Sequence, residues 1–227
     1  MKKLILTTLL LIAAPIFIFS QIYNKNSNMS DFINQRNFGK FTGYDDKNSP
    51  IVGSPYDNDE FQLGYIISKT NQKYNDIKLR FNIYNNSIEY KNEEGEIYSL
   101  SIPELFDFFT IGEKKYKYYP YSVNKKVDKG YFSVISEGKA TLLLKERVIF
   151  KEATEPAAYK EAEPAKFNRV IGEYYIQIGE HEARRIGGKK DLIEILSADV
   201  EGFIKKNKIN QNKKEDLTKL IEYYNSL

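Results

Sequence analysis

The side chains able to do acid–base chemistry do not fall into a catalytic spacing. His181 is the one histidine of the sequence, and it lies between Glu180 and Glu182. A serine–histidine–acid triad would have to use it, yet no Gly-x-Ser-x-Gly sequence is present to offer the serine. One histidine also cannot build a histidine-rich metal site. We therefore predict that His181 occupies a hairpin turn and is not catalytic.

The densest group of candidate metal ligands is formed by Asp57, Asp59 and Glu60, within the stretch 53–61. Calcium binds clusters of such oxygen ligands. The spacing lacks the glycine and the distal glutamate of the twelve-residue EF-hand loop. Gly, Ser, Pro, Asp and Asn together also make ordinary turns. The sequence therefore predicts a turn before the first strand, and we expect no metal there.

Two further segments could hold an anion or act in hydrolysis. Residues 187–191, Gly-Gly-Lys-Lys-Asp, precede a helical segment, where backbone amides can bind an anion. The rest of the phosphate-loop pattern is missing, so we interpret them as a hinge between sheet and helices. Glu93 and Glu94 lie in a predicted turn and are expected to be solvated. We predict no catalytic residue and no cofactor.

The elements that must position these side chains are mostly strands. Ile77, Leu79, Phe81 and Ile83 alternate with polar residues, which is the pattern of a strand with one buried face. Similar short runs, joined by turns rich in Gly and Asn, follow throughout residues 61–187. The 18 Tyr and 14 Phe also suit half-buried strands. This part predicts an antiparallel β-meander of about 8–10 strands, as a curved sheet or partly closed barrel.

Residues 188–227 predict a helical C-terminal segment with two or three short helices. Three apolar groups recur at helical spacing: Leu192, Ile193 and Leu196; Val200, Phe203 and Ile204; and Leu217, Leu220, Ile221 and Tyr224. Helices this short are not stable alone in water, so they must pack together or against the sheet. Strands followed by helices indicate the α+β class.

An approximate tandem repeat fills residues 151–167, with KEATEPAAY followed by KEAEPAKF. Pro156 and Pro164 argue against a continuous helix or central strand, so we predict a protruding loop or hairpin end. Two interpretations stay open. The loop is a variable solvent-exposed segment, or it is a partner-binding flap that uses Tyr159 and Phe167.

The first 20 residues have the pattern of a secretory signal peptide. Lys2 and Lys3 precede an apolar run from Leu4 to Phe19, and Ser20 supplies a small residue for cleavage. The alternative is an uncleaved membrane anchor. The run has 16 residues, fewer than the roughly 20 that cross a bilayer, so we favour cleavage. Residues 21–60, rich in Asn, Lys, Ser and Asp, then predict a poorly ordered N-terminal arm.

Charge and cysteine content restrict the partners and the compartment. Without the two leader lysines the chain has 32 basic and 31 acidic residues, so nothing favours nucleic-acid binding. The absence of cysteine excludes disulfides and a lipid-modified cysteine. No later stretch is apolar enough to span a membrane. We expect a soluble exported protein, periplasmic or secreted, with no prediction of its oligomeric state.

Several short stretches together carry a family resemblance. They are Phe19-Ser20-Gln21, Gly53-Ser54-Pro55-Tyr56, the Glu-Pro-Ala repeat, and the closing residues 214–227. On these stretches the chain resembles an uncharacterised family of exported proteins from Bacteroidetes-type bacteria. The resemblance implies bacterial origin and export, and it implies no activity.

These observations lead us to expect a non-enzymatic binding or structural protein of the bacterial envelope. It would act through its sheet surface or the loop 151–167, on an unknown envelope protein. One alternative is a periplasmic carrier that holds an apolar ligand in the concavity of a curved sheet. A second alternative is a hydrolase that uses a pair of carboxylates.

Overall fold

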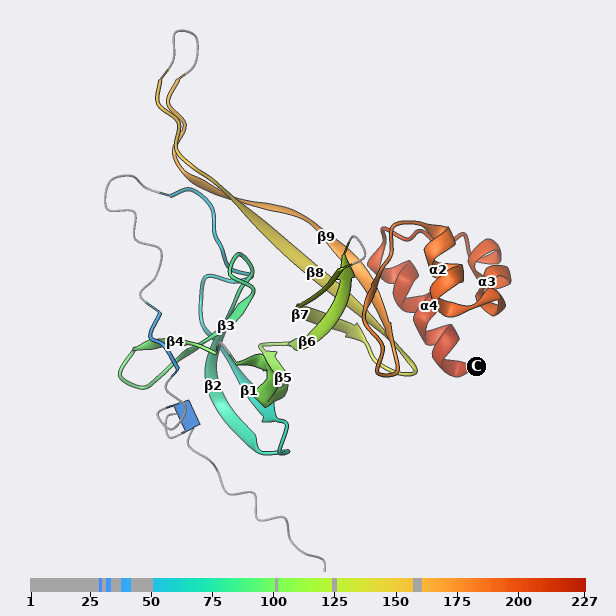
Figure 1. The fold of residues 1–227 in the computed structure, drawn as a ribbon, viewed down its shortest axis with the longest axis horizontal. Coiled ribbons are helices and arrows are strands. Elements are labelled where there is room, and N and C mark those ends of the chain that lie inside the picture. Colours follow the sequence, from blue (N-terminus) through green and yellow to red (C-terminus); the bar gives the residue numbers. More distant parts are fainter. Residues whose placement is uncertain are drawn as a thin grey trace, which may run out of the picture.

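The computed structural model describes residues 29, 32–33, 38–41, 51–100, 102–123, 126–156 and 161–227. It shows a ten-stranded antiparallel sheet, curled into a half-barrel, followed by three short helices (Figure 1). The strands are β1 Gln62–Ser68, β2 Lys73–Asn82, β3 Ser87–Lys91, β4 Ile97–Ser99, β5 Phe106–Ile111, β6 Lys114–Val123, β7 Lys126–Ser136, β8 Ala140–Lys151, β9 Lys166–Ile178 and β10 Arg184–Arg185. The helices are α2 Lys189–Leu196, α3 Glu201–Lys206 and α4 Lys214–Ser226. The predicted α+β class is confirmed.

The strand order follows the chain except at one place. The order is β10-β9-β8-β7-β6-β5-β1-β2-β3-β4, so β5 returns to pair with β1 after the β2–β4 excursion. In β2 the alternation places Ile77, Leu79 and Phe81 in the core, as predicted. Buried apolar faces of this kind drive the sheet to curl around its own side chains.

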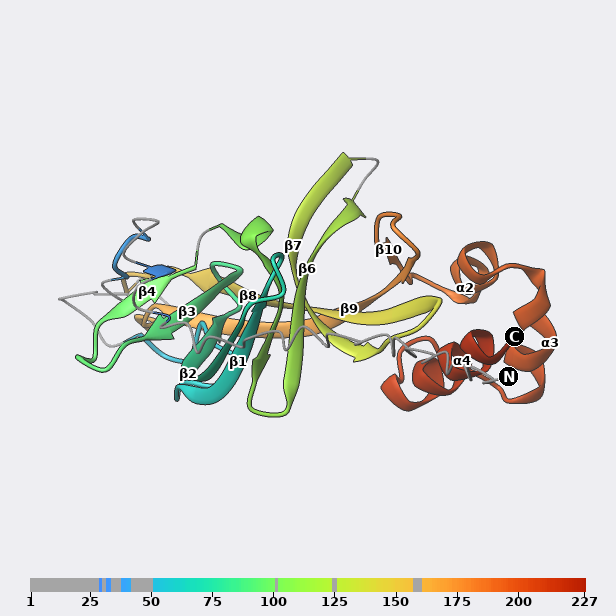
Figure 2. The ribbon, with the colours of Figure 1, turned by 90° about the horizontal axis from the view of Figure 1, so that it is seen from below.

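The core consists of three hydrophobic clusters, the smallest of which contains Tyr121, Phe132 and Tyr175. The largest fills the half-barrel of β1–β6 with aromatic rings, among them Tyr74, Phe109 and Tyr116. A second lies between the helices and the adjoining ends of β8 and β9, where Leu142 and Ile176 meet Leu217. The helical end and the half-barrel therefore lie at opposite ends of the molecule (Figure 2). Within the described residues, no helix has the length and apolar character needed to cross a membrane.

Part of the predicted N-terminal arm packs on the sheet. Met29, Ile33 and Phe38 are buried in the half-barrel cluster. The Val52 amide donates to the Ala165 carbonyl (2.9 Å), and the Asp57 amide donates to the Phe81 carbonyl (3.0 Å). The structure thus differs from the expected arm over residues 51–60, because these residues gain backbone partners from strands distant in sequence. The predicted leader, residues 1–20, lies outside the described residues.

The described residues of the repeat, 151–156 and 161–167, lie at the outer end of the long β8–β9 hairpin (Figure 1). Thr154 and Glu163 pair across it through two backbone hydrogen bonds, so the hairpin continues beyond the ends of the two strands. Phe167 is buried at its base, against Phe150 and Tyr84. Its ring is therefore not offered to a partner, whereas Tyr159 lies outside the described residues.

Candidate functional site

Arg80 of β2 holds the loop 53–61 against the sheet. Its guanidinium lies between the rings of Tyr56 (3.5 Å) and Phe61 (4.3 Å), an arrangement that favours a cation over each aromatic face. It also donates a hydrogen bond to the Asp59 carbonyl (2.9 Å). The loop that follows the Gly53-Ser54-Pro55 turn is therefore fixed in position by one side chain of the sheet.

Glu89 of β3 in turn holds Arg80. Its carboxylate is completely buried and accepts two hydrogen bonds from Arg80 (2.7 and 3.2 Å) and one from Asn82 (2.8 Å). A buried carboxylate needs such partners, because an unpaired charge inside a protein is very costly. The position of the loop therefore depends on a charge pair within the sheet.

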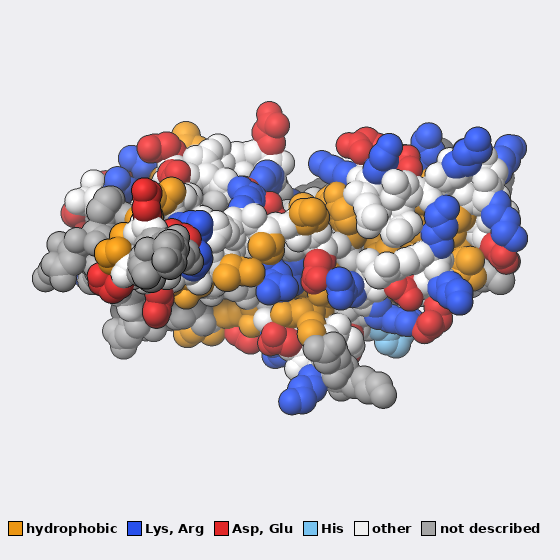
Figure 3. All heavy atoms as spheres, turned by 90° about the horizontal axis from the view of Figure 1, so that it is seen from above, with side chains coloured by type: hydrophobic (Ala, Val, Ile, Leu, Met, Phe, Trp, Pro, Cys, Tyr) orange, Lys and Arg blue, Asp and Glu red, His pale blue; other side chains and the backbone are white. Residues whose placement is uncertain are grey.

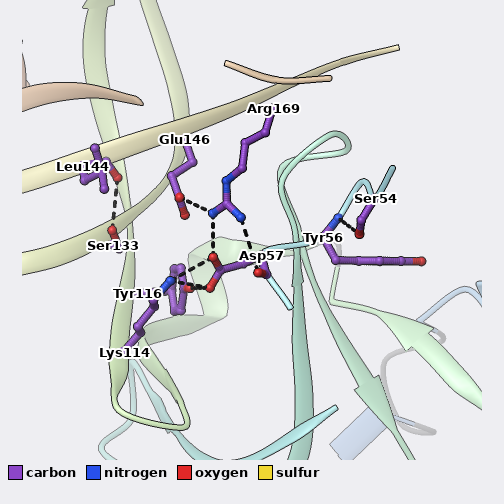
Figure 4. Close-up of polar contacts among 9 residues, drawn as sticks. All are labelled: Ser54, Tyr56, Asp57, Lys114, Tyr116, Ser133, Leu144, Glu146 and Arg169. Carbon is purple, nitrogen blue, oxygen red and sulfur yellow. Dashed lines mark hydrogen bonds and ion pairs between the residues drawn. The ribbon is translucent and has the colours of Figure 1, made fainter. Parts of the chain in front are cut away.

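Asp57, at the centre of this loop, connects two distant strands (Figure 4). Lys114 and Tyr116 of β6 donate to it at 2.7–2.8 Å, and Arg169 of β9 donates at 2.7 Å. Burial alone would raise the pKa of Asp57, but the hydrogen bonds from Lys114, Arg169 and Tyr116 outweigh it and lower the pKa. Asp57 is therefore an ionised structural link between the loop, β6 and β9.

Arg169 continues the link to β8. The same guanidinium pairs with Glu146, whose other carboxylate oxygen is buried and has no hydrogen-bond partner among the described residues. Figure 4 shows Asp57, Arg169 and Glu146 in a row between the loop and the β8–β9 hairpin. Arg169 thus pairs with two carboxylates at once.

Replacing Arg169 with methionine should lower the free energy of unfolding by about 2 kcal/mol at pH 7, because Glu146 then loses its cation and Asp57 keeps only one, Lys114. The ionised form of Asp57 stabilises the fold above pH ~4, and this contribution is lost as the pH falls through its lowered pKa. The deficit should therefore shrink in acid. Urea denaturation measures it. Arg185→Met, which breaks the exposed pair with Glu173, should change the free energy by less than ~0.5 kcal/mol.

An irregularity in the β8–β9 ladder lies beside Glu146. The register shifts between the pairs Lys145–Glu173 and Arg147–Val170, so Ile171 and Gly172 together oppose Glu146. A Cβ at Gly172 would lie 2.7 Å from a Leu144 methyl group, so glycine permits the close approach. A bulge of this kind re-aims neighbouring side chains. As a result Lys145 and Glu146, adjacent on one strand, both line the same cavity.

This cavity, which we call the Lys145 cavity, has a volume of about 470 Å³. Aromatic and charged side chains from β6, β7, β8 and β9 line it, with the turn after β2 closing one side. The principal lining residues are Tyr84, Asn86, Tyr121, Asp128, Lys145, Glu146, Glu173 and Tyr175. A pocket with aromatic walls and a few convergent charges is the usual form of a small-molecule site.

Lys145 is the unusual residue of the cavity. Its Nζ lies 4.5 Å from the centre of the Tyr121 ring and 4.8 Å from that of Phe132. It has no hydrogen bond or ion pair with any described residue. A Cβ at Gly130 would collide with this Nζ, so any larger residue there would displace the amine. Burial lowers the pKa of Lys145 to about 8, although Asp128 and Glu173 act to raise it.

The carboxylates near Lys145 already have partners. The Tyr121 hydroxyl donates to Asp128 (2.9 Å). The Tyr175 hydroxyl donates to Glu173 (3.3 Å), which also pairs with Arg185 (2.9 Å). Burial and these acidic neighbours raise the pKa of Tyr121, so its hydroxyl stays protonated and remains a donor. The amine of Lys145 is therefore open to a ligand, and one carboxylate oxygen of Glu146, which also lines the cavity, likewise has no hydrogen-bond partner among the described residues.

The residues considered from the sequence lie elsewhere, with the exception of Asp57. His181 is exposed in the turn after β9, where its amide donates to the Ile178 carbonyl. Asp59 accepts a hydrogen bond from Ser54 and Glu60 is exposed, so the three acids do not converge on one point. Among the described residues, no group of three His, Cys, Asp or Glu side chains could hold a metal ion.

The remaining two segments are explained by local structure. The amides of Gly187 and Gly188 donate to the Asp191 carboxylate at 2.7 and 2.9 Å. The start of α2 is thus occupied by a carboxylate of its own helix, and no external anion is needed. Glu93 and Glu94 are exposed in the β3–β4 turn, as predicted.

Comparisons with protein-family models, with curated proteins and with solved structures find no match for this chain. The Lys145 cavity therefore has to be interpreted from its own geometry. In the sequence its lysine follows the apolar run Leu142–Leu144, which is typical of an ordinary strand. The one local signal is a lysine directly after that run. Its partners come from three other strands, which no spacing in the sequence reveals.

Proposed function

We propose that this protein is an exported, non-enzymatic binding protein of the bacterial envelope, whose ligand places an anionic group against Lys145. One observation carries the proposal: the half-buried amine of Lys145 faces a cavity and has no acceptor among the described residues. Export and envelope location are supported by the leader pattern of residues 1–20 and by the family resemblance.

The energetics of Lys145 favour a binding role over a structural one. A lysine that served the fold would be paired, as Lys117 is with Glu137 at 3.1 Å. Lys145 instead loses hydration without gaining a hydrogen bond, which is a cost to stability. Residues held at such a cost, with a perturbed pKa in a cavity, are typical of functional sites.

The other two expectations gain less support. A carrier for an apolar ligand needs an empty apolar concavity, but the half-barrel is filled with packed rings such as Phe109 and Tyr116. A hydrolase could use Asp128 and Glu173, which both line the Lys145 cavity. Both carboxylates are engaged by tyrosine hydroxyls, which favours binding over proton transfer.

The proposal is tested by titrating the mature chain with acetate, succinate and benzoate, observed by ligand-detected NMR at pH 7. We expect at least one of these carboxylates to bind, and Lys145→Gln to weaken its binding at least ~10-fold because a charge-assisted hydrogen bond is lost. Binding should also weaken above pH 8, as the ammonium loses its proton.

Lys190→Gln is the matched control, since Lys190 is exposed at the start of α2 and does not line the cavity. It should bind the same carboxylates as the unmodified chain. Absence of binding by all three carboxylates, or equal binding by Lys145→Gln, would contradict the proposal.

A further inference from the structure

The surroundings of Lys145 favour its neutral amine as well as its interaction with an anion. One side of Nζ lies against the backbone of Gly130, and the Tyr121 and Phe132 rings lie within 5 Å. These contacts keep water away from the ammonium. With a pKa of about 8, about a tenth of the amine is unprotonated at pH 7, far more than for a lysine with an ordinary pKa. An unprotonated, unpaired amine in a cavity is a nucleophile.

We propose that the ligand of the Lys145 cavity is a small oxo acid, and that Lys145 captures its aldehyde or ketone group as a reversible imine. This inference rests on the proposed function, because the carboxylate of the oxo acid supplies the anionic group. It adds the chemical class of the ligand and the bond that holds it.

The reaction balances without any oxidant or reductant. The lone pair of Nζ attacks the carbonyl carbon, a proton passes from nitrogen to the carbonyl oxygen, and a carbinolamine forms. Loss of one water molecule then leaves the carbon–nitrogen double bond. Protonation of the imine restores the positive charge on nitrogen, which faces the ligand's own carboxylate. Hydrolysis reverses the reaction and releases the ligand.

The charged groups around the amine leave it free to attack a carbonyl carbon. Asp128 of β7 and Glu173 of β9 raise the pKa of Lys145 through their charges, and Arg147 of β8 lowers it. None of them forms an ion pair with Nζ, so none blocks the attack. The proton that leaves the ammonium passes to water, since both carboxylates are engaged by tyrosine hydroxyls. The cavity volume of about 470 Å³ accommodates a ligand of several heavy atoms beside the amine.

Lys117 shows why geometry distinguishes Lys145 from other partly buried lysines. Burial acts to lower the pKa of Lys117, but hydrogen bonding to Glu137 and the negative charges nearby together outweigh it and raise the pKa. Its amine is therefore held protonated and paired at 3.1 Å. Lys190, on the surface, serves as the exposed comparison.

The test is reductive trapping with glyoxylate and sodium cyanoborohydride on the mature chain, followed by peptide mass spectrometry. Reduction of the imine leaves a carboxymethyl group on the lysine that reacted. At pH 7 we expect Lys145 to be modified at least ~10-fold faster than Lys117 or Lys190, because its lower pKa leaves more free amine. This selectivity should fall towards pH 10.5, where exposed lysines also lose their protons.

The controls separate this inference from the proposed function. Gly130→Ala should displace the amine and reduce trapping at Lys145 while leaving Lys190 unchanged. If acetate, succinate or benzoate binds through Lys145 but glyoxylate labels it no faster than Lys190, the imine is excluded and the proposed function stands. If glyoxylate labels Lys145 selectively while acetate, succinate and benzoate do not bind, the proposed function fails and the imine inference stands.

Discussion

Replacing Arg80 with methionine should lower the free energy of unfolding by about 3–5 kcal/mol, the range found when one partner of a buried ion pair is removed. Glu89 would keep its hydrogen bond from Asn82 (2.8 Å), but its charge would be buried without a cation. The loop 53–61 would also lose the guanidinium that lies between Tyr56 and Phe61. The same substitution therefore weakens the support of Asp57 and of the row that leads to Glu146.

Urea denaturation at pH 7 measures this loss, and a second variant identifies its cause. The double substitution Arg80→Met with Glu89→Gln removes both charges, so it should recover at least ~1.5 kcal/mol of the loss. Lys205→Met, which breaks an exposed pair with Glu201, should change stability by less than ~0.5 kcal/mol. An Arg80→Met loss below ~1 kcal/mol, or a double variant no more stable than the single one, would show that the buried charge does not dominate.

Replacing Lys145 with methionine should raise the free energy of unfolding at pH 7 by about 1–3 kcal/mol. The pKa of Lys145 falls from 10.5 to about 8 in the fold, and each unit corresponds to ~1.4 kcal/mol of cost to the charged form. Methionine keeps the packing of the stem but loses the contact of the cation with Tyr121 and Phe132. We therefore expect less than the full value.

The stability gain of Lys145→Met should depend on pH in a defined direction. The cost of the charged lysine is complete below pH 8, where it is protonated in both the folded and unfolded chains. Between pH 8 and about 10.5 the folded chain holds fewer protons, so the stability of the unmodified protein rises relative to the variant. The advantage of Lys145→Met should accordingly shrink as the pH is raised.

Denaturation at pH 7 and at pH 10 measures both effects. Lys190→Met should show no gain at either pH, because Lys190 is exposed. A variant that is more stable yet no longer binds carboxylates would show that the fold retains Lys145 for function. If Lys145→Met is less stable than the unmodified protein at pH 7, Lys145 is a structural residue and the binding proposal loses its main support.

Much of the fold can be predicted from local sequence patterns, because buried apolar residues recur at the period of a strand or of a helix. The alternation at Ile77, Leu79 and Phe81 predicts a strand, and the strand is β2. The spacing of Leu217, Leu220 and Ile221 predicts the helix α4 with its buried face. Strands followed by short helices were enough to assign the α+β class.

Residues 51–60 show what local sequence patterns cannot predict, namely contacts with residues distant in the sequence. Their Asn, Asp and Pro content is typical of a loosely held segment, but Val52 pairs with β9 and Tyr56 with the end of β2. In the sequence, Asp57 is a candidate metal ligand because Asp59 and Glu60 are close to it. In the structure its partners are Lys114, Tyr116 and Arg169, all more than 50 residues away. Such contacts depend on how the sheet curls, which no short window of sequence contains.

The sequence by itself determined the type of most elements, the near balance of charge in residues 21–227, and the lack of a recognised catalytic spacing, because these properties are local or additive. Only the tertiary structure decided which charged side chain would lack an ion-pair partner. Glu89, Asp57 and Glu173 are each paired by residues from other segments, while Lys145 is surrounded by Gly130 and aromatic rings. The physical reason is that desolvation and pairing are set by neighbours in space, and four strands supply those neighbours.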